Sequence, residues 1–128
     1  MPYDDPRWMG GIGMIGTKAD YHAAMHCDLL LMLGADYPYS EFLPREAVVI
    51  QVDERARVIG RRAPTRLGVI GSVRPTVKSL IDRVKPKSDR SFFDRVAAQR
   101  KTWDDMQASR PIPRAARTAF IRRRWRAW

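Results

Sequence analysis

Cysteine is nearly absent: Cys27 is the single cysteine among 128 residues, which excludes an internal disulfide and fits a reducing compartment. Long hydrophobic runs are absent as well. The longest, Leu29–Leu33, is far shorter than the ~20 residues that a membrane-spanning helix needs. The first residues lack the basic and apolar regions of a signal peptide. We therefore expect a cytoplasmic protein without a membrane span, and the 45% hydrophobic and 30% charged residues favour a soluble globular chain.

Acidic residues are missing from one part of the chain, the segment 110–128, which contains seven arginines. The remaining residues carry 17 basic and 14 acidic side chains, so the net charge of +10 belongs mainly to this tail. Arginine interleaved with tryptophan can hold phosphate backbones and stack on bases, or lie on an anionic membrane surface. A basic nucleic-acid-binding protein that acts through the tail is therefore one alternative, although we do not expect a nucleic-acid partner.

Three short apolar runs have the length and composition of strands. They are Leu29–Leu33, Val48–Val52 and Leu67–Ile70. Strands that read as continuous apolar runs are typical of parallel sheets buried on both faces. Asp53 follows the second run directly, at its carboxyl end.

Helical patterns alternate with these runs. Thr17 is expected to cap a helix that reaches about Met25 or His26, with Asp20 as a weak capping-box partner. Ser72 is expected to cap a second helix, which would end at Lys85–Pro86 and carry one apolar stripe of Val77, Leu80, Ile81 and Val84. A third helix is expected from Ser88, with one apolar face of Phe92, Val96, Trp103 and Met106 that the polar Gln99 interrupts.

Strands alternating with helices predict an α/β fold with a parallel sheet. Three strands are few for this class, so the chain reads as part of a domain. The pattern Gly11-x-Gly13-x-x-Gly16 has the spacing of a dinucleotide-binding fingerprint, but no strand precedes it. We interpret it as a glycine-rich loop packed at a sheet edge, although its backbone N–H groups and the following helix start could still approach a phosphate.

Four stretches together resemble a known family. They are GIGMIGTKADY, CDLLLMLGADYPYSEFLP, VIQVDERARVIGRR and GVIGSV. In order and spacing they are similar to the central domain of thiamine-diphosphate-dependent enzymes, closest to the pyruvate oxidase and quinone-linked pyruvate dehydrogenase group, with acetolactate synthase a more distant relative. The resemblance covers roughly residues 2–108.

The resemblance implies how the chain is organised. It implies a partial Rossmann-like parallel sheet, of the NAD/FAD-binding type, in residues 1–86. Residues 87–109 would form a linker helix toward a C-terminal domain that this sequence lacks. Residues 110–128 would be an irregular basic tail. Because the match ends at Pro111-Ile112, we interpret this tail as an out-of-frame reading of GC-rich DNA or as the terminus of a gene fragment.

The resemblance also implies a site for FAD. Its residues would be the loop Ile12, Gly13, Met14 and Ile15, the turn Gly34, Ala35, Asp36, Tyr37 and Pro38, the acid Asp53, which would bind the adenosine ribose, and Ser72. Ser72 stands where the family usually has aspartate, which puts the adenine-side contact in doubt.

The resemblance implies no catalytic residue in this chain. In the parent enzyme, thiamine diphosphate and Mg²⁺ lie in two other domains and between subunits, and the parent is expected to be a homotetramer. The chain would then supply flavin contacts and structural support in a fragment of an enzyme that decarboxylates and oxidises a 2-oxo acid, with the missing thiamine-binding domains as its partners. A stand-alone nucleotide-binding module is the other alternative.

His22 and His26 stand four residues apart, so on one helix they could share a metal ion. We interpret them as part of a helix face and expect no metal site.

Overall fold

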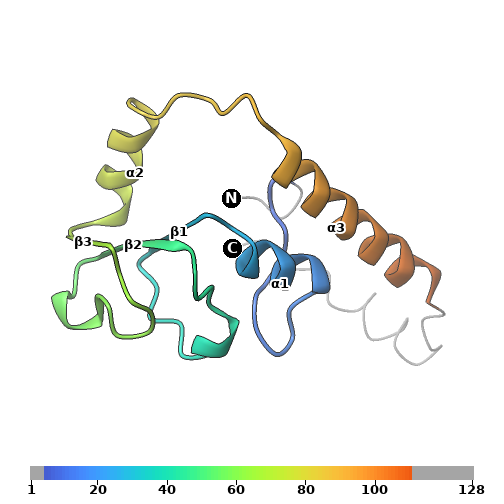
Figure 1. The fold of residues 1–128 in the computed structure, drawn as a ribbon, viewed down its shortest axis with the longest axis horizontal. Coiled ribbons are helices and arrows are strands. Elements are labelled where there is room, and N and C mark those ends of the chain that lie inside the picture. Colours follow the sequence, from blue (N-terminus) through green and yellow to red (C-terminus); the bar gives the residue numbers. More distant parts are fainter. Residues whose placement is uncertain (1–4, 111–128) are drawn as a thin grey trace, which may run out of the picture.

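A three-stranded parallel sheet lies toward one end of the computed structural model, which describes residues 5–110 (Figure 1). The strands are β1 (Leu29–Leu33), β2 (Val48–Asp53) and β3 (Leu67–Ile70), in the spatial order β1-β2-β3. Ile50 of β2 lies between Leu31 of β1 and Leu67 of β3. The predicted α/β fold with a parallel sheet is thus confirmed.

Helix α1 (Lys18–Met25) precedes the sheet and begins as predicted at Thr17. The Asp20 backbone N–H donates to Thr17 Oγ1 at 3.2 Å, and the Thr17 N–H donates to Asp20 Oδ2 at 2.9 Å. This reciprocal capping box satisfies two donors that the first turn of a helix otherwise leaves free.

Helices α2 (Val73–Ile81) and α3 (Ser91–Ser109) differ at their ends from the predictions. Ser72 stands before α2, but its hydroxyl donates to Glu54 Oε1 at 2.5 Å instead of capping the helix. Helix α2 also ends before the predicted Lys85–Pro86. Helix α3 begins three residues after the predicted Ser88, because the Asp89 carboxylate accepts the backbone N–H of Ser91 at 2.9 Å and forms a turn there.

The two faces of the sheet are covered unequally. On one face, Met32 and Val49 pack with Leu43 and Ala63 of the connecting loops, which contain the short 3-10 helices η1 (Ser40–Phe42) and η2 (Ala56–Val58). On the other face, Leu29 is 47% exposed and Leu67 is 52% exposed. The prediction of strands buried on both faces is therefore wrong for the residues that the structure describes.

The reason is the position of α2, which contacts β2 and covers only part of this second face. Val52, near the carboxyl end of β2, is almost fully buried, whereas Ile81 at the end of α2 is 72% exposed. The apolar stripe predicted on this helix therefore has its last turn in solvent.

Gln51 holds both connecting loops against the sheet. Its side-chain amide donates to the carbonyls of Ala35 and Val58, each at 3.2 Å, and accepts the N–H of Gly60 at 2.9 Å. The side chain is almost fully buried. Sequence reasoning missed this residue, although a single amide within an apolar strand was the available signal.

Helix α3 packs along α1, and Figure 1 shows the two side by side at one end of the molecule. Arg100 of α3 donates to the carbonyl of Met9 at 2.7 Å, and its guanidinium lies 4.7 Å from the ring centre of Trp8. The predicted linker helix is thus attached to the N-terminal segment.

Within residues 5–110, no helix is long and apolar enough to cross a membrane. The predicted basic tail, residues 110–128, lies outside the described residues except for Arg110.

Candidate functional site

The carboxyl ends of the three strands meet at one edge of the sheet, and a cavity of about 370 Å³ opens there. Its walls come from the segments that follow the strands and from the first turn of α2. The lining residues are Gly34, Asp53, Glu54, Arg55, Ser72, Val73 and Arg74. Ligands of open α/β sheets bind at this edge. Three of the predicted site residues, Gly34, Asp53 and Ser72, are thus brought together.

Asp53 is the most deeply placed ionisable group of this cavity, with 3% of its surface exposed. Its Oδ1 accepts the backbone N–H of Arg55 at 2.8 Å and the Arg55 Nε at 3.2 Å. The side-chain and backbone hydrogen bonds from Arg55 lower the pKa of Asp53 below its ordinary value. A carboxylate held in this way stays ionised, and its Oδ2 has only a long contact, at 3.5 Å, from the Arg55 guanidinium.

The other charged groups of the cavity are balanced. Two arginines, Arg55 and Arg74, and two acids, Asp53 and Glu54, line the cavity. The Glu54 carboxylate accepts a hydrogen bond from the hydroxyl of Ser72. Arg74 forms no ion pair with any residue of the described segment 5–110. Ser72, Val73 and Arg74 at the start of α2 line the cavity, so the positive end of this helix faces it. The first turn of the helix holds no acid.

The predicted loop 12–15 and the predicted turn 34–38 meet at one contact. Gly13 has φ +114°, and a Cβ there would overlap the hydroxyl of Tyr37. That hydroxyl is buried without a partner among the described residues, and burial raises the pKa of Tyr37. Met14 and Ile15 at the loop tip are 79% and 100% exposed, so they are open to contact from outside the chain.

The remaining predicted residues lie apart from the cavity. Asp36 accepts from Arg62 Nε at 2.7 Å and from Arg61 at 3.2 Å, and the hydrogen bond from Arg62 chiefly lowers the pKa of Asp36. Ala35 packs against the core, Pro38 is exposed, and Ile12 lines a separate cavity beside β1. The sequence did not point to Arg55 or Arg74. They line the cavity because they stand two residues after Asp53 and Ser72, respectively.

Metal-binding side chains do not gather in the structure as far as it is described: no three His, Cys, Asp or Glu residues between 5 and 110 lie close enough to hold an ion. His22 and His26 stack with ring centres 5.4 Å apart.

Low pH is expected to destabilise the fold through Asp53. Its folded pKa is lowered, so the contribution of its carboxylate to stability is present above the unfolded pKa of about 3.9 and is lost as the pH falls below it. Urea unfolding from about pH 6 to about pH 2 should show wild type losing its advantage over Asp53→Asn across that range. An advantage that stays constant down to the lowest pH would contradict the Arg55 contact.

The open parallel layer, with a cavity at the carboxyl edge of its strands, defines a Rossmann-like α/β domain. The sequence model of the family "Thiamine pyrophosphate enzyme, central domain" matches residues 1–80. The chain therefore belongs to this family, as its four motifs predicted.

The chain is similar in sequence to three known proteins. An uncharacterized 42.6 kDa protein in the isoamylase 3′ region of Pseudomonas amyloderamosa is 39% identical over 127 residues, covering 98% of this chain and 32% of that protein. The putative thiamine pyrophosphate-containing protein YdaP of Bacillus subtilis is 32% identical, covering 88% of this chain and 21% of YdaP. Pyruvate oxidase of Lactiplantibacillus plantarum is 22% identical, covering 81% of this chain and 18% of the oxidase.

The chain thus spans about a third of the first relative and about a fifth of the other two. The first alignment leaves only about 2% of this chain outside it, so it includes part of the Arg-rich segment 110–128. A segment that is translated in frame would be expected to align with a relative in this way. The interpretation of residues 110–128 as an out-of-frame reading stays a prediction.

Proposed function

We propose that this chain supplies the adenosine-side contacts of a flavin nucleotide in a pyruvate-oxidase-like, thiamine-diphosphate-dependent enzyme. The observation that carries the proposal is Asp53, an ionised and nearly buried carboxylate at the carboxyl end of β2, on the wall of a cavity of about 370 Å³. A cavity of this size accommodates a nucleoside, and an acid at this edge is the group that binds ribose hydroxyls in Rossmann-like sites.

The residues around Asp53 fit a nucleotide. A ribose hydroxyl would donate to Asp53 Oδ2 and take the place of the long contact from the Arg55 guanidinium, while the 2.8 Å bond from the Arg55 backbone keeps the carboxylate in place. Arg55 and Arg74 would then be available to a diphosphate. Gly34, at φ +60°, lets the chain turn sharply after β1 at the wall of the cavity.

In the parent enzyme the flavin would accept electrons after decarboxylation of a 2-oxo acid. This chain would add no catalytic residue to that reaction. Its part is to bind the nucleotide through the carboxyl edge and to present Met14 and Ile15 at an exposed loop tip. Thiamine diphosphate and Mg²⁺ would be held by other domains of the parent, which we propose as a cytoplasmic homotetramer.

Binding of ADP to the full chain tests the proposal. Isothermal titration calorimetry is expected to show weak binding of ADP, with FAD no tighter, because only the adenosine side of the site is present. Asp53→Asn should weaken ADP binding about tenfold, since an ionised acceptor becomes a neutral amide. The matched control is Asp28→Asn, whose carboxylate is exposed and remote from the cavity.

Three outcomes separate the alternatives. Equal ADP affinity of wild type and Asp53→Asn would contradict the proposal. Purification of the chain with stoichiometric FAD would contradict its restriction to the adenosine side. Tight and Asp53-dependent binding of ADP with no contribution from the flavin would favour the stand-alone nucleotide-binding module.

A further inference from the structure

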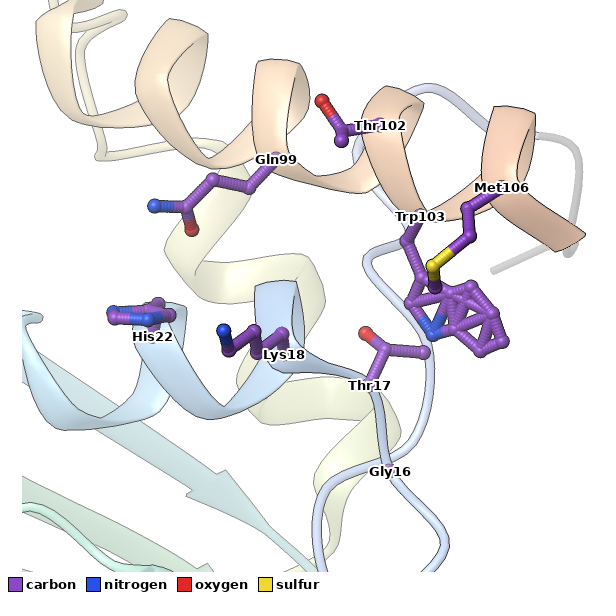
Figure 2. A pocket seen from close by; sticks show the side chains of 8 residues that line it. All are labelled: Gly16, Thr17, Lys18, His22, Gln99, Thr102, Trp103 and Met106. Atoms are coloured by element: carbon purple, nitrogen blue, oxygen red, sulfur yellow. The ribbon is translucent and has the colours of Figure 1, made fainter.

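A second and larger cavity, of about 600 Å³, lies between α1 and α3. Figure 2 shows it bounded below by the start of α1 and above by the last turns of α3. It is lined by Gly16, Thr17, Lys18, His22, Gln99, Thr102, Trp103 and Met106. It shares no lining residue with the cavity at the carboxyl edge of the sheet.

Gln99 lines this cavity and also a smaller one, of about 240 Å³, on its Val96 side. Its Oε1 is buried and has no hydrogen-bond partner among residues 5–110. In Figure 2 the amide extends from α3 into the space above Lys18 and His22. Buried polar atoms in folded proteins nearly always have a partner, so this oxygen is suited to a ligand that brings an N–H or O–H group.

The ionisable groups around the cavity are basic. Lys18 and His22 belong to the lining and no acid does. Lys18 forms no ion pair with the residues that the structure describes. Asp20 of the same helix does not line the cavity, and its Oδ2 accepts the Thr17 N–H at 2.9 Å and the Thr17 hydroxyl at 2.5 Å. The cavity therefore favours a ligand with a negative charge.

One end of the cavity is apolar and aromatic. Trp103 and Met106 lie together above Thr17 in Figure 2, with the Met106 sulfur beside the indole. Polarisable faces of this kind favour a flat ring stacked against them.

Simple helix packing does not account for this end of the interface. Val96, on the same face of α3 and one turn before Gln99, is 3% exposed because α1 covers it. Trp103, one turn after Gln99, still lines an open cavity, and Met106 is 49% exposed. A smaller cavity of about 240 Å³ reaches the Val96 end of the interface, and the larger one opens where Gln99, the two basic residues and the aromatic wall meet.

We propose that this cavity binds a flat aromatic anion that carries a hydrogen-bond donor. The ring lies against Trp103 and Met106, the donor binds Gln99 Oε1, and the anionic group lies beside Lys18 and His22. This ligand site is separate from the nucleotide site and does not depend on it.

Calorimetry with the full chain and 6-amino-2-naphthoate tests the proposal, because this probe has two flat rings, an amine and a carboxylate. 2-Naphthoate lacks the amine and is expected to bind about tenfold more weakly, since Gln99 Oε1 then stays unpaired. The methyl ester of the probe lacks the charge and is expected to bind about threefold more weakly, as suits an exposed lysine. Equal affinities for all three compounds, or no binding of the probe, would overturn the proposal.

Two variants locate the site. Gln99→Leu should remove the preference for the amine while still binding 2-naphthoate as wild type does, which also shows that the variant is folded. Lys18→Met should weaken the probe about threefold, and Lys78→Met, an exposed lysine of α2, should not. Asp53→Asn should leave probe binding unchanged even if it abolishes ADP binding. Retention of the amine preference in Gln99→Leu, or competition between ADP and the probe, would overturn the proposal.

Discussion

Gln51→Leu is expected to destabilise the fold by about 3 kcal/mol, because it leaves three buried or half-buried backbone groups without partners. The groups are the carbonyls of Ala35 and Val58 and the N–H of Gly60. Leucine fits the apolar strand in size, so the loss reports the hydrogen bonds and not an overfilled core. Urea unfolding monitored by circular dichroism measures the difference.

The effect is expected to extend to the nucleotide edge. Gln51 holds the turn after β1 at Ala35 and the loop after β2 at Val58, and both segments begin at the cavity that Gly34 and Asp53 line. The matched control is Gln107→Leu on α3, whose side chain has no hydrogen bond within the described residues and whose substitution should change stability by less than about 0.5 kcal/mol. Equal stability of Gln51→Leu and wild type would show that the buried amide does not hold the loops.

Gly16→Ala is expected to cost about 2 kcal/mol or more, because the new methyl group meets backbone and not a movable side chain. A Cβ at Gly16 would lie 3.0 Å from both the backbone N and the carbonyl O of Gly13, and closer still to the carbonyl of Gly11. The N–H of Gly16 also donates to the Gly13 carbonyl at 2.9 Å, so the turn cannot widen without losing this bond. Thermal unfolding of the two proteins measures the cost.

Gly11→Ala provides the matched comparison within the same pattern, since a Cβ there meets no atom within 4 Å. It should leave stability within about 0.5 kcal/mol of wild type. Equal losses for the two substitutions would contradict the turn as described. The contrast explains why the glycine spacing misleads as a dinucleotide fingerprint: Gly16 closes a tight turn and Gly13 makes room for Tyr37, and residues 5–12, described just before them, form no strand.

The local signals in the sequence predicted the elements well. The three strands lie within one residue of the apolar runs, and α1 begins at the Thr17–Asp20 capping box. Both features depend on residues close together in the chain, through apolar runs of strand length and through a hydrogen-bond pair three residues apart.

The contacts between distant segments could not be predicted in the same way. Ser72 donates to Glu54, 18 residues earlier, instead of capping α2. Gln51 reaches Ala35, 16 residues away, and Asp36 binds arginines 25 and 26 residues further on. No local pattern fixes which segments the sheet brings together, and these pairs decide which polar side chains remain available at the carboxyl edge.

The family resemblance supplied the candidate residues, and the structure divides them into groups. Gly34, Asp53 and Ser72 share one cavity, Gly13 touches Tyr37, and Asp36 is bound by arginines elsewhere. Arg55 and Arg74 join the first group through the geometry alone, which makes phosphate recognition part of the same proposal.

The account depends on the carboxyl edge of the sheet being the place where a nucleotide binds. Titration of the ¹⁵N-labelled full chain with ADP, followed through backbone amide shifts, tests this directly. The account predicts that the shifted amides belong to the turn after Gly34, to residues 53–55 and to residues 72–74, and that Asp53→Asn reduces these shifts at equal ADP concentration. Shifts centred on the helix pair α1 and α3, or none at the strand ends at saturating ADP, would contradict it.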